Sequence, residues 1–188
     1  RLEVWQGFIW INFDDDADAL DAEFGGLFET YEAYQFSDMI VTRRSEYELD
    51  CNWKLIMDIA QEDYHTGTVH RTSVGTQVAY ELDDTHASWQ CLHLPRESSI
   101  GVLPGESTVF PHIAGLPPGL AGGTNFLLVY PNSCFGCVQD CMWWVSFMPL
   151  GPDRCINNVG FCFPRSIAER PDFDEVAAKY YHRWDLSV

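Results

Sequence analysis

Residues Cys51–Thr72 read CNWKLIMDIAQEDYHTGTVHRT, and this stretch decides how the rest of the chain is interpreted. Its first half has the period of a helix with one apolar face, because apolar residues recur at steps of three and four. These residues are Leu55, Ile56, Ile59 and Ala60. Its second half brings two histidines, His65 and His70, close to several carboxylates. Such a combination indicates a metal site or an acid–base site.

The spacing of the two histidines predicts a break in the helix. They are five residues apart, which on a regular helix corresponds to a rotation of about 140°. On an unbroken helix their side chains would not reach one ion. The intervening Thr66, Gly67 and Thr68 are poor residues for a helix interior. We therefore expect the helix to end near His65, with a turn that brings His70 back to face it.

These residues carry a resemblance to a known family. The string N-W-K-x7-E-x-Y-H-x4-H, from Asn52 to His70, resembles the mononuclear-iron motif of Rieske non-haem iron oxygenase α subunits. Other segments resemble the strand that follows the Rieske domain in that family, its central sheet strands and the turn between them; they are Trp5–Phe13, Asn125–Asn132 and Pro149–Arg154. The resemblance thus extends along most of the chain.

The resemblance implies an α+β fold of the helix-grip (Bet v 1-like) type, a curved antiparallel sheet wrapped around long helices with the iron between them. Residues 1–188 would form the mononuclear-iron catalytic domain of a longer chain, and the [2Fe–2S] Rieske domain would lie upstream. The activity implied is that of a terminal oxygenase, which activates O₂ at Fe(II) to hydroxylate or oxidatively demethylate a small aromatic or amine-bearing substrate. The implied partners are a ferredoxin or reductase as electron donor and further subunits in an α₃ or α₃β₃ trimer.

The same resemblance assigns roles to residues of the motif. His65 and His70 would be two of the three iron ligands. The third would be an aspartate just beyond Val188, with Asp185 as a poor substitute within the chain. Glu62 would link the iron-site histidine to a Rieske histidine of the neighbouring subunit.

Three further residues are expected near the substrate. Asp58 stands where many relatives have asparagine, and an additional carboxylate there would accept a proton, hold a water or favour a cationic substrate. Ile59 is expected in the pocket wall, since pockets of this kind are mostly apolar. His112 lies in the segment Ser98–Gly123, whose glycines and prolines are typical of an entrance loop.

Composition limits the partners of the chain. Its 188 residues, 46% of them hydrophobic, suit one globular domain. Eleven basic residues against 28 acidic ones give a net charge of −17, which argues against nucleic acid or an anionic membrane as the main partner. No run approaches the ~20 apolar residues of a membrane span. The chain begins at Arg1 rather than methionine, which favours a domain taken from a longer protein.

The seven cysteines are odd in number and lack the spacing of a disulfide framework, which indicates free thiols and a cytoplasmic location. Cys91-x-His93 resembles half of a Rieske ligand motif, but no C-x-x-H follows it. Cys134-x-x-Cys137 is interpreted as the tip of a hairpin rather than half of a metal site, because no second pair follows at suitable spacing.

Hydrophobic patterns and turn residues predict the remaining elements. Strands are expected at Trp5–Phe13, Met39–Leu49, Thr124–Tyr130, Cys137–Met148 and Cys155–Pro164. A hairpin is expected from Gln77–Leu82 and His86–His93, with Asp83 and Asp84 in its turn. Helices are expected at Gly26–Tyr34 and at Phe173–Asp185, the latter preceded by Pro171.

Two functions of other classes remain open on the residues alone. One is a non-catalytic helix-grip module that binds an apolar ligand, in which the histidines are structural. The other is a zinc hydrolase, which requires three protein ligands and an activated water.

Overall fold

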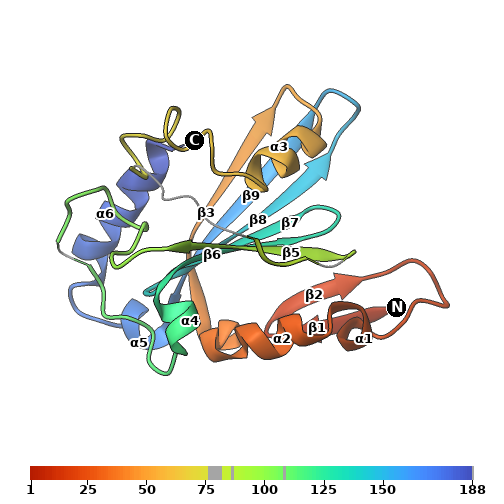
Figure 1. Ribbon diagram of the computed structural model, residues 1–188, viewed down its shortest axis with the longest axis horizontal. Coiled ribbons are helices and arrows are strands. Elements are labelled where there is room, and N and C mark those ends of the chain that lie inside the picture. Colours follow the sequence, from red (N-terminus) through yellow and green to blue (C-terminus); the bar gives the residue numbers. More distant parts are fainter. Residues whose placement is uncertain (76–81, 86, 108, 188) are drawn as a thin grey trace.

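A seven-stranded antiparallel sheet forms the centre of the protein, which we describe from a computed structural model covering residues 1–75, 82–85, 87–107 and 109–187. Its strands lie in the order β3-β9-β8-β7-β6-β5-β4 (Figure 1). From β4 to β9 each strand pairs with the next along the chain, and β3 joins β9 at the far edge. The bounds are β3 Met39–Leu49, β4 Leu82–Thr85, β5 Trp89–Pro95, β6 Gly123–Val129, β7 Ser133–Cys137, β8 Met142–Pro149 and β9 Cys155–Pro164.

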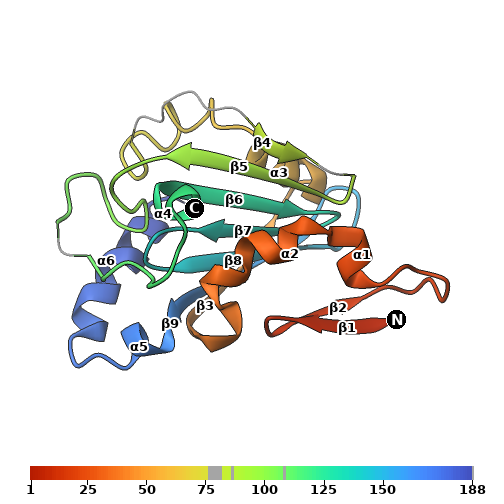
Figure 2. The ribbon, with the colours of Figure 1, turned by 60° about the horizontal axis from the view of Figure 1, so that its bottom comes forward.

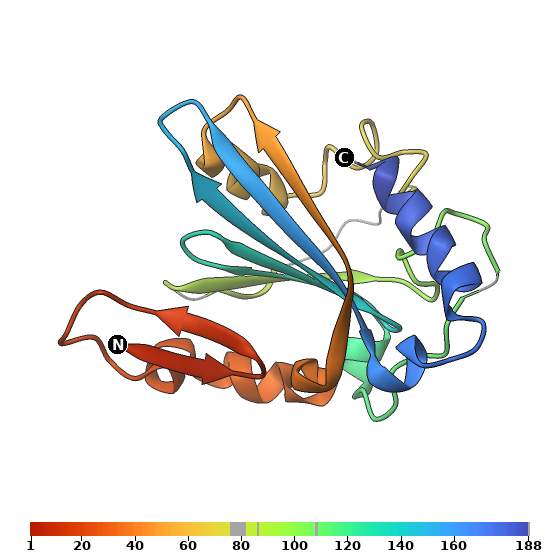
Figure 3. The same cartoon turned by 180° about the vertical axis from the view of Figure 1, so that it is seen from behind.

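The two faces of the sheet are covered by different elements (Figures 2 and 3). One face carries α3 (Trp53–Ala60) and α6 (Phe173–Asp185). The other carries the hairpin of β1 (Leu2–Trp5) and β2 (Phe8–Ile11) with two short helices, α1 (Leu20–Phe24) and α2 (Gly26–Tyr31). The remaining short helices are α4 Pro118–Ala121, α5 Arg165–Ala168 and the 3₁₀ turns Glu32–Tyr34 and Phe36–Asp38. Among the described residues no helix is long and apolar enough to cross a membrane.

Each face of the sheet therefore has its own hydrophobic core. Neighbouring residues of a strand point to opposite faces, and β8 shows this directly. Trp143 and Val145 belong to the cluster under α3 and α6, whereas Met142 belongs to the cluster under α1 and α2. This explains why the central strands are apolar along most of their length.

Several predicted elements are confirmed. Met39–Leu49, Cys155–Pro164 and Phe173–Asp185 occur with the predicted bounds. The antiparallel sheet and the α+β class are also as predicted, but the expectation of several long helices is wrong. Among the described residues only α6 exceeds ten residues, with thirteen.

Other predictions need correction at turns. Trp5–Phe13 is not one strand: β1 and β2 are joined at Gln6 and Gly7, whose φ values are 44° and 88°. Positive φ at both positions is what a tight two-residue hairpin turn requires. Cys134–Cys137 is not a hairpin tip but lies within β7, and the β7–β8 turn is closed by a bond from the Val138 amide to the Cys141 carbonyl, 3.1 Å.

The predicted hairpin near residue 85 exists as β4 and β5, but its turn lies elsewhere. Asp83 and Asp84 fall inside β4 instead of between the strands. The predicted first strand, Gln77–Leu82, lies almost wholly outside the described residues.

We expect Gly136→Ala to destabilise the fold. Gly136 of β7 pairs with Trp143 of β8, and a Cβ at position 136 would overlap the Trp143 indole ring. Overpacking of this kind costs about 1–3 kcal/mol, measurable by urea unfolding. Gly119→Ala is the matched control, because a Cβ there has no neighbour within 4 Å. Equal effects of the two substitutions would contradict this account.

Candidate metal centre

Helix α3 positions the start of the ligand turn. Its N-cap is Asn52, whose side chain accepts a hydrogen bond from the Lys54 amide at 3.0 Å, a typical capping contact. The helix ends at Ala60, not near His65 as the sequence predicted. Its apolar face is also less buried than expected, since Leu55 is 55% exposed and Met57 is the residue that enters the core.

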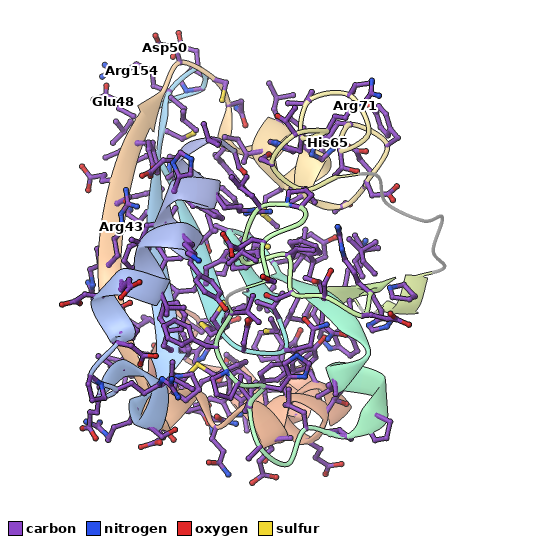
Figure 4. All side chains as sticks on the ribbon, turned by 90° about the vertical axis from the view of Figure 1, so that its left-hand side faces the viewer. Arg43, Glu48, Asp50, His65, Arg71 and Arg154 are labelled. Atoms are coloured by element: carbon purple, nitrogen blue, oxygen red, sulfur yellow. The ribbon has the colours of Figure 1, made fainter. Side chains whose placement is uncertain are left out.

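Residues 61–75 form a series of turns that bring the two histidines together. The His65 carbonyl accepts from the amides of Thr68 and Val69, at 3.0 and 2.7 Å. The His70 carbonyl in turn accepts from three amides, of which that of Val74 is nearest at 2.8 Å. As a result the centroids of the His65 and His70 rings are 5.2 Å apart, with an angle of 76° between the ring planes. Figure 4 shows His65 inside this segment beside α3 and Arg71 farther along the same segment.

Glu62 holds the ring of His65. One carboxylate oxygen contacts His65 Nδ1, and the other accepts the His65 backbone amide at 3.2 Å. Both side chains are largely shielded from solvent, with 23% and 19% exposed. Because Nδ1 is bonded to Glu62, Nε2 is the nitrogen of His65 that remains for a metal. A carboxylate behind a ligating histidine fixes the tautomer and orientation of its ring.

His70 is held in its neutral form. Burial, followed by the nearby His65 and the positive charge of Arg183, lowers the pKa of His70 below its usual value of 6.5. Neutral imidazole is the form that binds a metal ion. The environment therefore favours ligation by His70 at neutral pH.

The separation of the two rings is compatible with one shared metal ion. With metal–nitrogen distances of about 2.1 Å and an angle of about 90–110° at the metal, the ring centroids of two ligating histidines lie roughly 4.6–5.4 Å apart. The observed 5.2 Å falls in this range. Two imidazoles on one side of a site are the donors expected for non-haem Fe(II), together with one carboxylate.

A third ligand is not found in the part of the chain that the structure describes, where no group of three His, Cys, Asp or Glu side chains is suitable for a metal. Asp185 has another partner. Its carboxylate forms a two-point ion pair with Arg43, at 2.6 and 3.1 Å. Figure 4 places Arg43 on β3, on the opposite side of the view from His65.

A cavity of about 250 Å³ adjoins the histidines. Its walls come from the inner side of α3, the ligand turn, the sheet and the C-terminal end of α6. The lining residues include Ile59, Glu62, His65, His70, Phe126, Trp143, Phe147, Asn157, Arg183 and Trp184. A larger hollow of about 940 Å³ lies between the β1–β2 hairpin and the sheet, but it contains neither histidine. We take the smaller cavity as the functional one because it holds the candidate ligands.

Of the three residues predicted to lie near the substrate, Ile59 lines the cavity and the other two do not. Asp58 is exposed and is not in the cavity wall; its charge, after burial, contributes to the raised pKa of Tyr130. His112 is exposed in the loop and also lies outside the wall. Roles for Asp58 and His112 stay predictions.

Sequence analysis missed Arg183, Trp184 and Asn157. One signal was available for Arg183. The buried face of α6 follows helical spacing through Val176, Ala177 and Tyr180, and the next position in that series is Arg183. A charged residue in an apolar series is unusual and deserves a functional explanation.

Comparisons with known proteins identify the family of the chain. The family model "Ring hydroxylating alpha subunit (catalytic domain)" matches residues 36–188. The carnitine monooxygenase oxygenase subunit of Escherichia coli K12 is 30% identical over 116 residues, which cover 58% of this chain and 31% of that protein. Its counterpart in Acinetobacter baumannii is 29% identical over 92 residues, which cover 47% and 25%.

Solved structures share the fold. A quaternary ammonium Rieske monooxygenase has a TM-score of 0.72 at 20% identity, over 97% of this chain and 47% of that one. Naphthalene 1,2-dioxygenase from Rhodococcus has a TM-score of 0.67 at 20% identity, over 97% and 49%.

The family match over most of the chain shows that it belongs to the catalytic domains of ring-hydroxylating α subunits, the class that the motif resembled. The chain spans 25% to 31% of the length of the curated relatives it matches.

We expect Glu62→Ala to weaken iron binding. Without the carboxylate the His65 ring loses its fixed tautomer and orientation, and loss of such a partner lowers metal affinity about 10–100-fold. A competition titration with a chromogenic Fe(II) chelator measures the change. Asp58→Asn is the control, because Asp58 is an exposed carboxylate of the preceding helix. An unchanged affinity in Glu62→Ala would rule out this role.

Asp185→Asn should leave iron affinity unchanged, because the Asp185 carboxylate is paired with Arg43. The same titration tests this expectation. The substitution should instead lower stability by about 0.2–1 kcal/mol, as for other exposed ion pairs. A marked loss of iron would identify Asp185 as a ligand after all.

Proposed function

We propose that this domain activates O₂ at one ferrous ion bound by His65, His70 and a carboxylate outside the described residues, and that it oxidises a small organic substrate in the adjoining cavity. The observation that carries the proposal is the pair of imidazoles 5.2 Å apart, with Glu62 behind one of them, in a chain of this family. A ferrous ion in this position would supply the chemistry of O₂ reduction.

The residues of the chain have distinct tasks in this proposal. Glu62 accepts the Nδ1 proton of His65 and so directs Nε2 to the ion. The lowered pKa of His70 keeps that ring free of a competing proton. Phe126, Phe147 and the α3 residue Ile59 shield the ion and the substrate from bulk water, which strengthens electrostatic contacts inside the site.

Electron supply is part of the proposal. A Rieske [2Fe–2S] cluster of the whole protein would pass electrons to the ion, and a ferredoxin or reductase would reduce that cluster. Glu62 lies three residues before His65 and contacts it directly, which supports a role as the link towards a cluster in the neighbouring subunit. The relatives are oxygenase subunits by name, which supports such a multicomponent system. A trimer is proposed on family resemblance alone.

The substrate is proposed to be small. The cavity of about 250 Å³ is enough for a compact molecule, and its aromatic walls suit either an aromatic ring or an ammonium group. The similar solved proteins are a quaternary ammonium monooxygenase and a naphthalene dioxygenase. These relatives support oxidative attack on an amine-bearing or aromatic substrate by hydroxylation or demethylation.

We expect His65→Ala and His70→Ala each to abolish stoichiometric iron and substrate-dependent O₂ consumption. The loss of a ligand should exceed the about 10–100-fold change expected when only a hydrogen-bonded partner of a ligand is removed. Anaerobic purification followed by metal analysis measures the iron. His182→Ala is the matched control, an exposed histidine of α6.

The two alternative functions predict other results. A zinc hydrolase would contain zinc after anaerobic purification and would act without a reductant. A non-catalytic helix-grip module would contain no stoichiometric metal and would bind its ligand equally well after His65→Ala. Either result would refute the proposed function.

A further inference from the structure

Arg183 is a buried cation without an anionic partner among the described residues. It lies in the last turns of α6 and is 4% exposed. Within the described residues, its one hydrogen bond runs from Nε to the Ser73 carbonyl, at 3.3 Å. The guanidinium carbon lies 5.7 Å from the centroid of the Trp143 ring. The two terminal nitrogens have no acceptor within the described parts of the chain, and the residue lines the cavity.

A charge in this position is costly. Burial lowers the pKa of Arg183 to about 10; Cys141 has a smaller effect that raises this pKa, and the positive charge of Arg96 lowers it further. The side chain therefore remains protonated at neutral pH. Since an uncompensated buried charge opposes folding, Arg183 is expected to have a counterion when the protein works.

The surroundings of Arg183 contain further unused polar groups. Trp184 Nε1 and Asn157 Oδ1 are buried without a hydrogen-bond partner in the described structure, and both residues line the cavity. The Trp184 ring lies 5.6 Å from that of Trp143, over which the guanidinium of Arg183 is placed. Two hydrogen-bond donors, the guanidinium and the indole N–H, thus adjoin the same aromatic ring.

Arg183 and the histidines belong to one site. Arg183, His65 and His70 line the same cavity, and Arg183 binds the carbonyl of Ser73, three residues after His70. A small molecule in the cavity would therefore lie within reach of both.

We infer that the cavity receives a small organic carboxylate, whose oxygens pair with the guanidinium of Arg183 and accept from the indole N–H of Trp184. The planar fork of arginine matches a carboxylate in two-point contact. The apolar part of the ligand lies against Phe126 and Phe147, and its far end faces the histidines. This inference rests on the proposed function and adds to it the chemical class of the substrate.

The test compares acids with their neutral amides in the full-length, iron-loaded protein. Benzoate and benzamide form one pair of probes, and butyrate and butyramide a second, non-aromatic pair. Calorimetric titration gives each dissociation constant. We expect the unmodified protein to bind the acids more tightly, and Arg183→Gln to weaken acid binding about 30-fold or more, as when one partner of a buried charge pair is removed. Amide binding should stay within about twofold of the unmodified value.

Arg96→Gln is the matched control. Arg96 is also partly buried and donates to the neighbouring Val74 carbonyl at 2.8 Å, but it is not in the cavity wall. It should affect stability without changing the ratio of acid to amide affinity. Arg183→Lys keeps the positive charge but not the planar guanidinium. Its ratio of acid to amide affinity should lie between those of the unmodified protein and Arg183→Gln.

Three results would overturn the inference. The first is equal affinity of the unmodified protein for acids and amides. The second is a ratio of acid to amide affinity that Arg183→Gln leaves unchanged. The third is a change of this ratio in Arg96→Gln that equals the change in Arg183→Gln. The first needs no variant and therefore remains decisive if Arg183→Gln does not fold. Iron analysis of the same samples separates the two proposals: protein with iron but no preference for acids refutes only this inference, whereas protein without iron refutes the proposed function.

Discussion

The contact between Glu62 and His65 is the constraint on which the candidate metal centre depends. It joins the residue just after α3 to the first histidine and fixes which ring nitrogen is free. Were the helix to continue instead, the second histidine would lie about 140° around its axis. The turn is stabilised by backbone hydrogen bonds to the carbonyls of His65 and His70, so the histidine rings themselves need not hold it together. This leaves both imidazoles available for chemistry.

Helix α6 sets the position of the other half of the site. Its Tyr180 hydroxyl donates to Asp140 at 2.5 Å and accepts the Phe110 amide at 3.0 Å, which ties the helix to the β7–β8 turn and to the long loop. Three residues later, Arg183 binds the Ser73 carbonyl. The same helix therefore anchors the segment after His70 and places a guanidinium in the cavity wall. Helix α6 therefore helps to position both the candidate metal ligand His70 and the charged group in the cavity wall.

The sequence was informative where a local pattern alone determines the structure. The strand Met39–Leu49 and the helix Phe173–Asp185 have strong periodicity, and their bounds were predicted correctly. Glycine and threonine, which a helix interior disfavours, predicted a turn between His65 and His70, but they did not predict that the helix already ends at Ala60.

Turns were harder to predict, because their conformation depends on tertiary context. Gln6 adopts a positive φ although its side chain does not favour it, so the β1–β2 hairpin left no local signal. Contacts between residues far apart in the sequence were equally hard to predict. Nothing near Arg183 in the sequence shows that Trp143, forty residues away, lies beneath it.

The position of the charges in the cavity supports the inference that Arg183 recognises an anionic ligand. Carboxylates outnumber basic side chains by 28 to 11 in this chain, so a partner for a purely structural arginine would have been easy to provide. Arg43 of strand β3 has such a partner in Asp185, the last residue of α6. The two carboxylates in the cavity wall, Glu62 and Asp63, form no ion pair with Arg183 among the described contacts. Within the described residues, a cation thus lies buried and unpaired beside the candidate ligands, at a stability cost that a bound anion would relieve.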